Sequence, residues 1–321
     1  MAIERVLVIG NRDVSRSIIG ALIPSSPGGK GSHYRVTILT YPSQTPHLPS
    51  HVHLHHITHV TSDFSSPSLT SAFKGHDIII VAVPGGDTDF QIRIINAAVS
   101  AGVPRYIPYE FGQDTLNTGV QERLPKYLER ARVIEYLQDI CSEHQSFEWV
   151  GVAVGCILDR ALLTGDLGFD MQWQSATIHG TGNERFAVSS IERVGVVVES
   201  LIQQWGQVRN RYIYAAGTVT SANDIISCLE TISGSKWTIG CSDVDECVRE
   251  GRKRIGRGFL DSGVLLLERS VLYDQELSAV ERFLHSNSDE SLHLTPETTE
   301  KIAEKALHEL EHRGVPDCGC A

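Results

Sequence analysis

The sequence contains no apolar run that approaches the ~20 residues a membrane-spanning helix needs. Its first apolar run, Val6 to Ile9, is short, follows Glu4 and leads to no small-residue cleavage site, so we expect no signal peptide. Cysteine is scarce: the seven residues are odd in number and scattered, which argues against a disulfide framework and for a reducing compartment. These absences predict a cytoplasmic protein with no membrane partner.

Positive charge is also in short supply, since 28 Lys and Arg residues face 39 Asp and Glu residues, a net charge of −11. Nucleic-acid binding rests on neutralising phosphates with Lys and Arg, so we expect no nucleic-acid partner. A local basic pocket for a phosphorylated cofactor is still compatible with this balance. The 321 residues, 41% of them hydrophobic, suffice for one large domain with a smaller lobe.

The first half of the chain alternates strand-like and helix-like segments. The run Asp77 to Val83 is continuously apolar, which is typical of a strand buried on both faces of a parallel sheet. We predict strands at 5–9, 34–39, 54–60, 77–83, 105–107, 147–154 and 211–215, and helices at 14–22, 90–101, 128–140 and 221–232. This alternation predicts an α/β fold, a Rossmann-type doubly wound parallel sheet with right-handed crossovers.

The pattern loosens after Gly155. We assign residues 1–155 to a dinucleotide-binding domain, which residues 186–235 or so complete. Residues 156–185 and 236–321 are assigned to a smaller, mainly helical lobe that closes over the carboxyl edge of the sheet and binds substrate. From Cys241 onward we expect no strand.

The first strand-to-helix turn is the expected place for a dinucleotide diphosphate, because glycines there let the backbone approach the phosphates and the helix N-terminus attracts them. The turn runs from Gly10 through Asn11, Arg12 and Asp13 to Arg16. Only Gly10 survives of a Gly-x-x-Gly-x-x-Gly pattern, so an ordinary strand-turn-helix is the alternative. Asp13 either points away from the phosphates or weakens their binding.

Two features favour NADP(H) over NAD. The second strand ends at Leu39-Thr40-Tyr41-Pro42, without the acid that binds the ribose hydroxyls in NAD sites. Arg12 lies in the phosphate turn, where a guanidinium can hold a 2′-phosphate through two hydrogen bonds. A solvated turn residue is the alternative for Arg12.

The segment Tyr106 to Gly112 resembles the Pro-Ser-Glu-Phe-Gly signature of the NmrA-like and isoflavone-reductase-like proteins, atypical short-chain dehydrogenases. Further landmarks follow in order: Gly75 to Ile80, Gln91 before a helix that leads to Val103, Val188 to Gly195, and Ala216 to Thr220. The resemblance spans about residues 3 to 235. It implies NADP(H) and a small-molecule substrate, as in fungal secondary metabolism.

The resemblance also implies a catalytic lysine early in the helix after the signature, and this position is occupied by Arg130. Arginine does not readily cycle a proton, but it supplies a fixed positive charge to a developing oxyanion. Lys126 lies one helical turn earlier on the same face, and Tyr109 replaces the serine of the signature. We name Arg130, Tyr109 and Lys126 as candidate catalytic residues. The alternatives are a solvated charged face for Lys126 and a core aromatic for Tyr109.

The remaining candidates follow from the expected strand ends and from the resemblance. The cofactor-binding candidates are Gly10, Asn11, Arg12, Val14, Thr40, Tyr41, Val83, Pro84, Gly85, Gln91, Pro108, Glu110, Phe111 and Gly155. The substrate-binding candidates are Tyr109, Cys156, Ile157, Leu158 and Phe169, the last within an alternating apolar stretch, Gly165 to Trp173. His51, His53 and His55 alternate as on one face of a strand, but nothing nearby completes a metal site, and we expect none.

These patterns lead to two hypotheses. The first is an NADP(H)-dependent oxidoreductase that transfers hydride to a C=N, C=C or C=O bond of a bulky apolar molecule. Because Arg130 replaces the lysine, a variant in which reduction is coupled to a cyclisation templated by the pocket is attractive. The second is a non-catalytic redox sensor that binds NADP, as the founding members of the resembled family do.

Overall fold

The computed structural model describes residues 3–23, 34–84 and 87–312. Seven strands form one parallel sheet in the order β11-β6-β5-β4-β1-β2-β3. Their bounds are β1 (Arg5–Ile9), β2 (Arg35–Thr40), β3 (Ile57–Thr61), β4 (Ile78–Val81), β5 (Arg105–Ile107), β6 (Glu148–Ala153) and β11 (Arg211–Tyr214). The predicted doubly wound sheet is confirmed.

The third strand begins later than predicted. Residues Leu54–His56 form a short 3-10 turn, η1, and the strand starts only at Ile57. His51, His53 and His55 therefore do not share one face of a strand, and the interpretation as a strand face was wrong. The rings of His53 and His55 stack with centroids 5.6 Å apart within this turn region.

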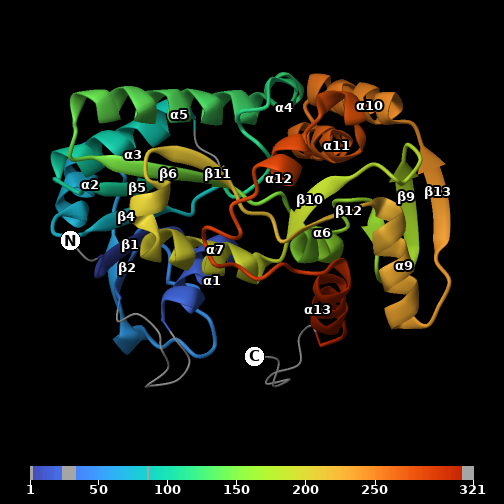
Figure 1. Cartoon of the computed structure of the whole chain (residues 1–321), viewed down its shortest axis with the longest axis horizontal. Helices are drawn as coiled ribbons and strands as arrows, with labels where there is room; N and C mark the ends of the chain where they lie inside the picture. Colours follow the sequence, from blue (N-terminus) through green and yellow to red (C-terminus); the bar gives the residue numbers. More distant parts are fainter. Residues whose placement is uncertain (1–2, 24–33, 85–86, 313–321) are drawn as a thin grey trace.

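Helices cover both faces of the sheet (Figure 1). One face carries α1 (Asp13–Leu22), α7 (Ile191–Gln203) and α8 (Trp205–Val208), and the other carries α2 (Ser66–Phe73), α3 (Thr88–Ser100) and α5 (Pro125–Glu143). On β4, Ile78 and Ile80 belong to one core cluster, while Ile79 and Val81 belong to the other. This two-sided burial explains the continuous apolar run in the sequence.

The second lobe lies beyond the carboxyl end of β6 and contains two small sheets, β12-β10-β7 and β13-β9-β8. The strands are β7 (Cys156–Ile157), β8 (Phe169–Asp170), β9 (Ser175–His179), β10 (Phe186–Ser189), β12 (Thr218–Thr220) and β13 (Thr238–Ser242). The helices are α4 (Thr118–Arg123), α6 (Leu158–Thr164), α9 (Ala222–Ser233), α10 (Val244–Gly256), α11 (Leu260–Tyr273), α12 (Glu281–His285) and α13 (Thr299–Glu311), and a second 3-10 turn, η2, spans Gln275–Leu277.

Two expectations for this lobe need correction. Strand β13 extends to Ser242, so the region from Cys241 is not free of strand, and its partner β9 lies some sixty residues earlier, beyond the reach of local patterns. Within 186–235, helix α7 and strand β11 complete the main sheet, but β10 and α9 pack into the core of the lobe. Ser221 caps α9 as the sequence predicts, since its hydroxyl accepts from the N–H of Asp224.

A close contact between two helices fixes the start of α1. The Ser17 hydroxyl donates to the Ile191 carbonyl (2.6 Å) and accepts from the Gly195 N–H (3.1 Å). A Cβ on Gly195 would lie 2.3 Å from the Ser17 carbonyl oxygen, so only glycine permits this approach. The turn after β1 is thereby held against α7.

Candidate active site

The turn after β1 lies where the strand order of the sheet reverses, between β1 and β4. Gly10 has φ +146°, and a Cβ there would lie 2.9 Å from the Ala82 carbonyl oxygen just after β4. The chain then enters α1, whose first N–H groups form a partly positive end. This is the arrangement in which open parallel sheets bind anionic ligands.

A cleft of about 390 Å³, here called the turn cleft, opens at this point. It is lined by Asn11, Arg12, Asp13, Val14, His47, Ala82, Pro84 and Tyr109. The Asn11 amide donates to the Thr45 carbonyl (2.6 Å) and its oxygen accepts from the His47 N–H, so Asn11 holds the loop after β2 over the turn. Sequence reasoning missed His47 as a lining residue, because nothing local reveals how this loop folds back.

Only some of the predicted cofactor residues lie at the turn cleft. Asn11, Arg12, Val14 and Pro84 line the turn cleft, and Gly10 shapes it. Phe111 and Gly155 line a neighbouring cavity instead, Val83 packs partly buried against the core, and Gln91 and Pro108 are buried. Gly85 lies outside the described residues.

Three of these candidates are engaged elsewhere. Thr40 is buried, and its hydroxyl donates to the Tyr41 carbonyl and contacts the His59 ring. The Tyr41 ring packs against the Phe64 ring in a tilted arrangement, with centroids 4.3 Å apart. Glu110 is almost fully buried and bonds inward to side-chain hydroxyls. None of the three lines the turn cleft: Thr40 and Glu110 are buried, whereas Tyr41 is exposed and packs on Phe64.

A second cavity of about 250 Å³, here called the lobe cavity, lies between the signature loop, the segment after β6 and helix α11. Most of its side chains are apolar, among them Phe111, Leu124, Ile157, Leu167, Leu265 and Leu272. Charged side chains also reach it: Arg160, Asp166, Glu268 and Arg269. The cavity suits a molecule with an apolar body and a few polar groups.

Of the four substrate candidates on the lobe, two line the lobe cavity and two do not. Cys156 and Ile157 line the lobe cavity. Leu158 and Phe169 are at most 1% exposed and belong to the lobe core, so they do not form its wall, contrary to the prediction. The alternating stretch around Phe169 packs inward, which is the core alternative that alternation alone leaves open. Burial raises the pKa of the Cys156 thiol to about 12, so it stays neutral and is no nucleophile.

Arg130 lies between the turn cleft and the lobe cavity. Its guanidinium carbon is 5.0 Å from the centre of the Tyr109 ring, which lines the cleft, and 4.8 Å from that of Tyr127, which lines the cavity. Its Nη1 atom is buried and has no hydrogen-bond partner among the described residues. A buried donor without a partner is costly, so this atom is available to an acceptor that enters between the two spaces.

The surrounding groups keep this junction cationic. Burial raises the pKa of the Tyr109 and Tyr127 hydroxyls, so both stay neutral hydrogen-bond donors at neutral pH. Burial also raises the pKa of Glu110, while the nearby Arg130 charge lowers it. The Glu110 carboxylate accepts from the hydroxyls of Thr115 and Tyr212, which fixes it behind the arginine.

Residues 36–240 match the model of the NmrA-like family. Over 272 residues the chain is 30% identical to oxidoreductase aprR of Aspergillus flavus, with 84% of this chain and 87% of the relative covered. The chain belongs to the NmrA-like family. The resemblance predicted from the signature loop is therefore confirmed.

Solved structures with the same fold are more distant in sequence. Those of pinoresinol-lariciresinol and phenylcoumaran benzylic ether reductases align with a TM-score of 0.71 at 16% identity, over 94% of this chain and 99% of theirs. The binary complex of leucoanthocyanidin reductase with NADPH from Vitis vinifera aligns with a TM-score of 0.69 at 15% identity, over 95% and 99%. At this identity the likeness establishes the fold.

Lys126 of this NmrA-like chain lies one turn before Arg130 on α5 and pairs with Glu268, a residue that lines the lobe cavity. Its ammonium forms an ion pair with Glu268 of α11, and its side chain is about half exposed. Partial burial and the Arg130 charge lower the pKa of Lys126 to about 8. Lys126 thus joins α5 to α11 and does not itself line either space.

Metal-ligating clusters and membrane-spanning helices are both absent from residues 3–23, 34–84 and 87–312. No group of three His, Cys, Asp or Glu side chains in these ranges is arranged to hold a metal ion. None of the helices they contain combines the length and apolar character that crossing a membrane requires.

Proposed function

We propose that this NmrA-like protein is an NADP(H)-dependent oxidoreductase that transfers hydride to a bulky, largely apolar small molecule. The observation that carries the proposal is the position of Arg130, which contacts an aromatic ring of the cleft at the phosphate turn and an aromatic ring of the mostly apolar cavity. The relative aprR is named an oxidoreductase, and leucoanthocyanidin reductase, which shares the fold, binds NADPH.

The residues at the turn fit a phosphorylated dinucleotide. Gly10 lets the backbone approach a diphosphate, and the α1 N-terminus favours its charge. Arg12 is exposed at the turn, where it is placed to bind a 2′-phosphate, and no acid stands at the end of β2 to hold free ribose hydroxyls. When bound, NADP(H) supplies the hydride for the reaction.

Arg130 and Tyr109 act on the substrate in this proposal. The buried Nη1 of Arg130 stabilises negative charge that develops on a substrate oxygen or nitrogen. The neutral Tyr109 hydroxyl orients the same atom or gives it a proton. Because the guanidinium is a fixed cation and does not itself release a proton, neutral conjugated substrates suit this site best, since hydride addition to them leaves negative charge on an atom that Arg130 can stabilise. A cyclisation of the reduced intermediate within the lobe cavity is part of this proposal.

The experiment has two steps. NADPH binding to the purified protein is first measured by fluorescence, and the oxidation of bound NADPH is then followed while fractionated metabolites of the source organism are added. We expect tight binding and fraction-dependent loss of NADPH absorbance. Binding without turnover in any fraction contradicts the enzyme proposal.

A non-catalytic NADP sensor is the second candidate. It is favoured by Arg130 at the position of the catalytic lysine, and by Asp13 and Arg16 at glycine positions of the turn. The lobe cavity next to the turn cleft favours the enzyme, since a sensor has no need of a substrate space. Tight NADP binding with no turnover, together with a captured protein partner, would support the sensor.

A further inference from the structure

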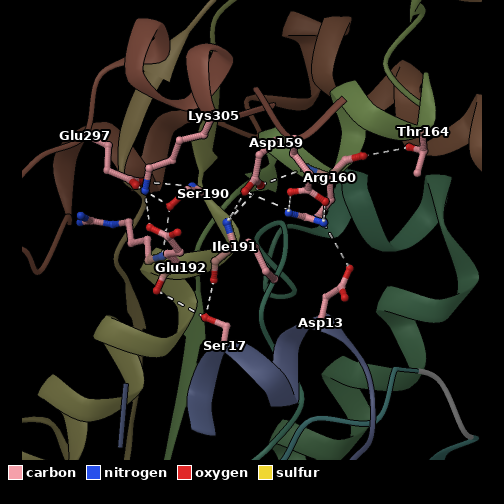
Figure 2. A network of polar contacts seen from close by, with 12 residues as sticks. Asp13, Ser17, Asp159, Arg160, Thr164, Ser190, Ile191, Glu192, Glu297 and Lys305 are labelled. Carbon is pink, nitrogen blue, oxygen red and sulfur yellow. Dashed lines mark hydrogen bonds and ion pairs between the residues drawn. The ribbon is translucent and has the colours of Figure 1, made fainter. Parts of the chain in front are cut away.

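Asp13 is the unexplained residue of the phosphate turn. It is the first residue of α1, it lines the turn cleft, and half of its side chain is exposed. A carboxylate at this point repels the diphosphate of a dinucleotide. A cation lies next to this carboxylate: Nη1 of Arg160 is 3.8 Å from Asp13 Oδ2 (Figure 2).

Arg160 comes from the other lobe. It belongs to α6 and lines the lobe cavity, while Asp13 lines the turn cleft, so the ion pair stands at a second point where the two spaces approach each other. Two hydrogen bonds to the Glu309 carboxylate of α13 hold the guanidinium in place. A third acid, Asp159, lies 4.0 Å away, but its oxygens accept from the Ile191 N–H at the start of α7.

We propose that Arg160 is a positioning residue for the cofactor diphosphate, supplied to the phosphate turn by the substrate lobe; this rests on the NADP(H) binding proposed above. Arg160 offsets part of the negative charge of Asp13 at the N-terminus of α1, although Glu309 and Asp159 share the same guanidinium. Removing the charge leaves Asp13 facing the phosphates without compensation. The lobe that forms the substrate space thus contributes to cofactor affinity.

The chain offers a matched ion pair at the same boundary. Lys305 of α13 pairs with Glu192 of α7, and both side chains are largely exposed (Figure 2). This pair also joins the lobe to the sheet domain, but neither residue lines the turn cleft. Loss of the Lys305 charge therefore measures how much NADPH affinity depends on an ion pair between the lobe and the sheet domain that does not touch the phosphate turn.

The test compares NADPH dissociation constants of the wild-type protein with those of Arg160→Gln, Arg160→Lys, Glu309→Gln and Lys305→Gln, after thermal melts have shown that each variant is folded. We expect Arg160→Gln to weaken binding by about two- to fivefold at low salt, the range of a partly exposed ion pair. Arg160→Lys restores most of this loss, and Lys305→Gln changes nothing.

Glu309→Gln separates positioning from simple stabilisation of the lobe. It removes the α6–α13 ion pair but leaves Arg160 beside Asp13 with one competing acid fewer. We expect its NADPH affinity to equal or exceed that of the wild type. Equal losses in Arg160→Gln and Glu309→Gln would assign Arg160 a purely structural role and overturn the proposal.

A double-mutant cycle with Asp13→Asn completes the test. Without the aspartate charge, Arg160→Gln should lose less affinity than it does in the wild-type background. If the wild type binds NADPH but Arg160→Gln binds it equally well, only this inference fails. If the wild type binds no NADPH, the proposed function fails with it.

Discussion

The Arg130 guanidinium carbon lies 5.0 Å from the centre of the Tyr109 ring, which lines the turn cleft. A cation over an aromatic face is stabilised by the ring's electron density, and it holds the ring in one orientation. In the proposed reaction this pair supplies a fixed positive charge where hydride transfer creates negative charge. It is the arrangement on which the first two predictions depend.

Replacing Arg130 with alanine should abolish most turnover and leave cofactor binding largely intact. Loss of a preorganised charge next to a developing anion lowers kcat by about 100-fold or more. We expect Arg130→Lys to keep part of the activity, because a positive charge remains. Steady-state kinetics and NADPH titration check both effects.

The control for that variant is Arg132→Ala on the same helix. Arg132 is exposed and pairs with Glu129, away from both spaces. Its removal should leave the kinetics unchanged. Unchanged turnover in both Arg130 variants would remove Arg130 from the site.

Tyr109→Phe keeps the ring beside Arg130 but removes the hydroxyl. Because the cation still faces an aromatic ring, we expect the melting temperature and NADPH affinity to stay close to wild type. A lost hydrogen-bond or proton donor should lower kcat by about 10- to 100-fold. If kcat holds while Tyr109→Ala loses activity, the ring alone carries the function of Tyr109.

Gly155→Ala should destabilise the protein strongly. Gly155 has φ +76°, and a Cβ there would lie 2.4 Å from the Ala187 carbonyl oxygen. Left-handed strain and overlap together cost about 2–4 kcal/mol of unfolding free energy. Gly234 is the matched control, since it has φ +66° but no atom within 4 Å of the place a Cβ would take, and Gly234→Ala should cost about 1 kcal/mol. Denaturant unfolding measures both, and equal losses would exclude the overlap.

Asp159 should make stability depend on pH between about 4 and about 7. Burial raises the pKa of Asp159 to about 6, against the hydrogen bonds from Ile191 and the nearby Arg160 charge. A carboxyl group with a raised folded-state pKa favours folding when protonated, so this contribution is complete below pH ~4 and is lost as pH rises through about 6.

Asp159→Asn removes this titration while its amide oxygen still accepts from the Ile191 N–H. We expect the wild type to lose stability relative to Asp159→Asn by on the order of 2–3 kcal/mol across that pH window. Melting curves at several pH values measure the difference. The exposed Asp139→Asn serves as a control, and parallel curves for wild type and Asp159→Asn would contradict the prediction.

The sheet could be predicted because most of its strands have a recognisable local pattern of apolar residues. The apolar run from Ile78 to Val81 has both faces buried, and its composition alone indicates that. Strand β13 was not predictable, because its partner β9 is distant in sequence and its own residues are mostly exposed. Pairing between distant segments leaves little local pattern.

The sequence predicted where the candidate site lies, but not which way each of its side chains points. The signature loop located Tyr109 and, through α5, Arg130, and both lie at the junction of the two spaces. The same loop suggested Glu110 for the cofactor, but this side chain turns inward to Thr115. Similarly, the pairing of Asp13 with Arg160 depends on how the two lobes meet, which motif and periodicity do not encode.

The contact between Ser17 and Gly195 bears on the order in which the protein is made. The two residues are 178 positions apart in the sequence, yet α1 and its turn are held in place through this contact. On the ribosome the phosphate turn is synthesised long before α7, the helix that supports it. A nascent chain should therefore acquire affinity for NADPH late, once α7 has emerged and docked against α1.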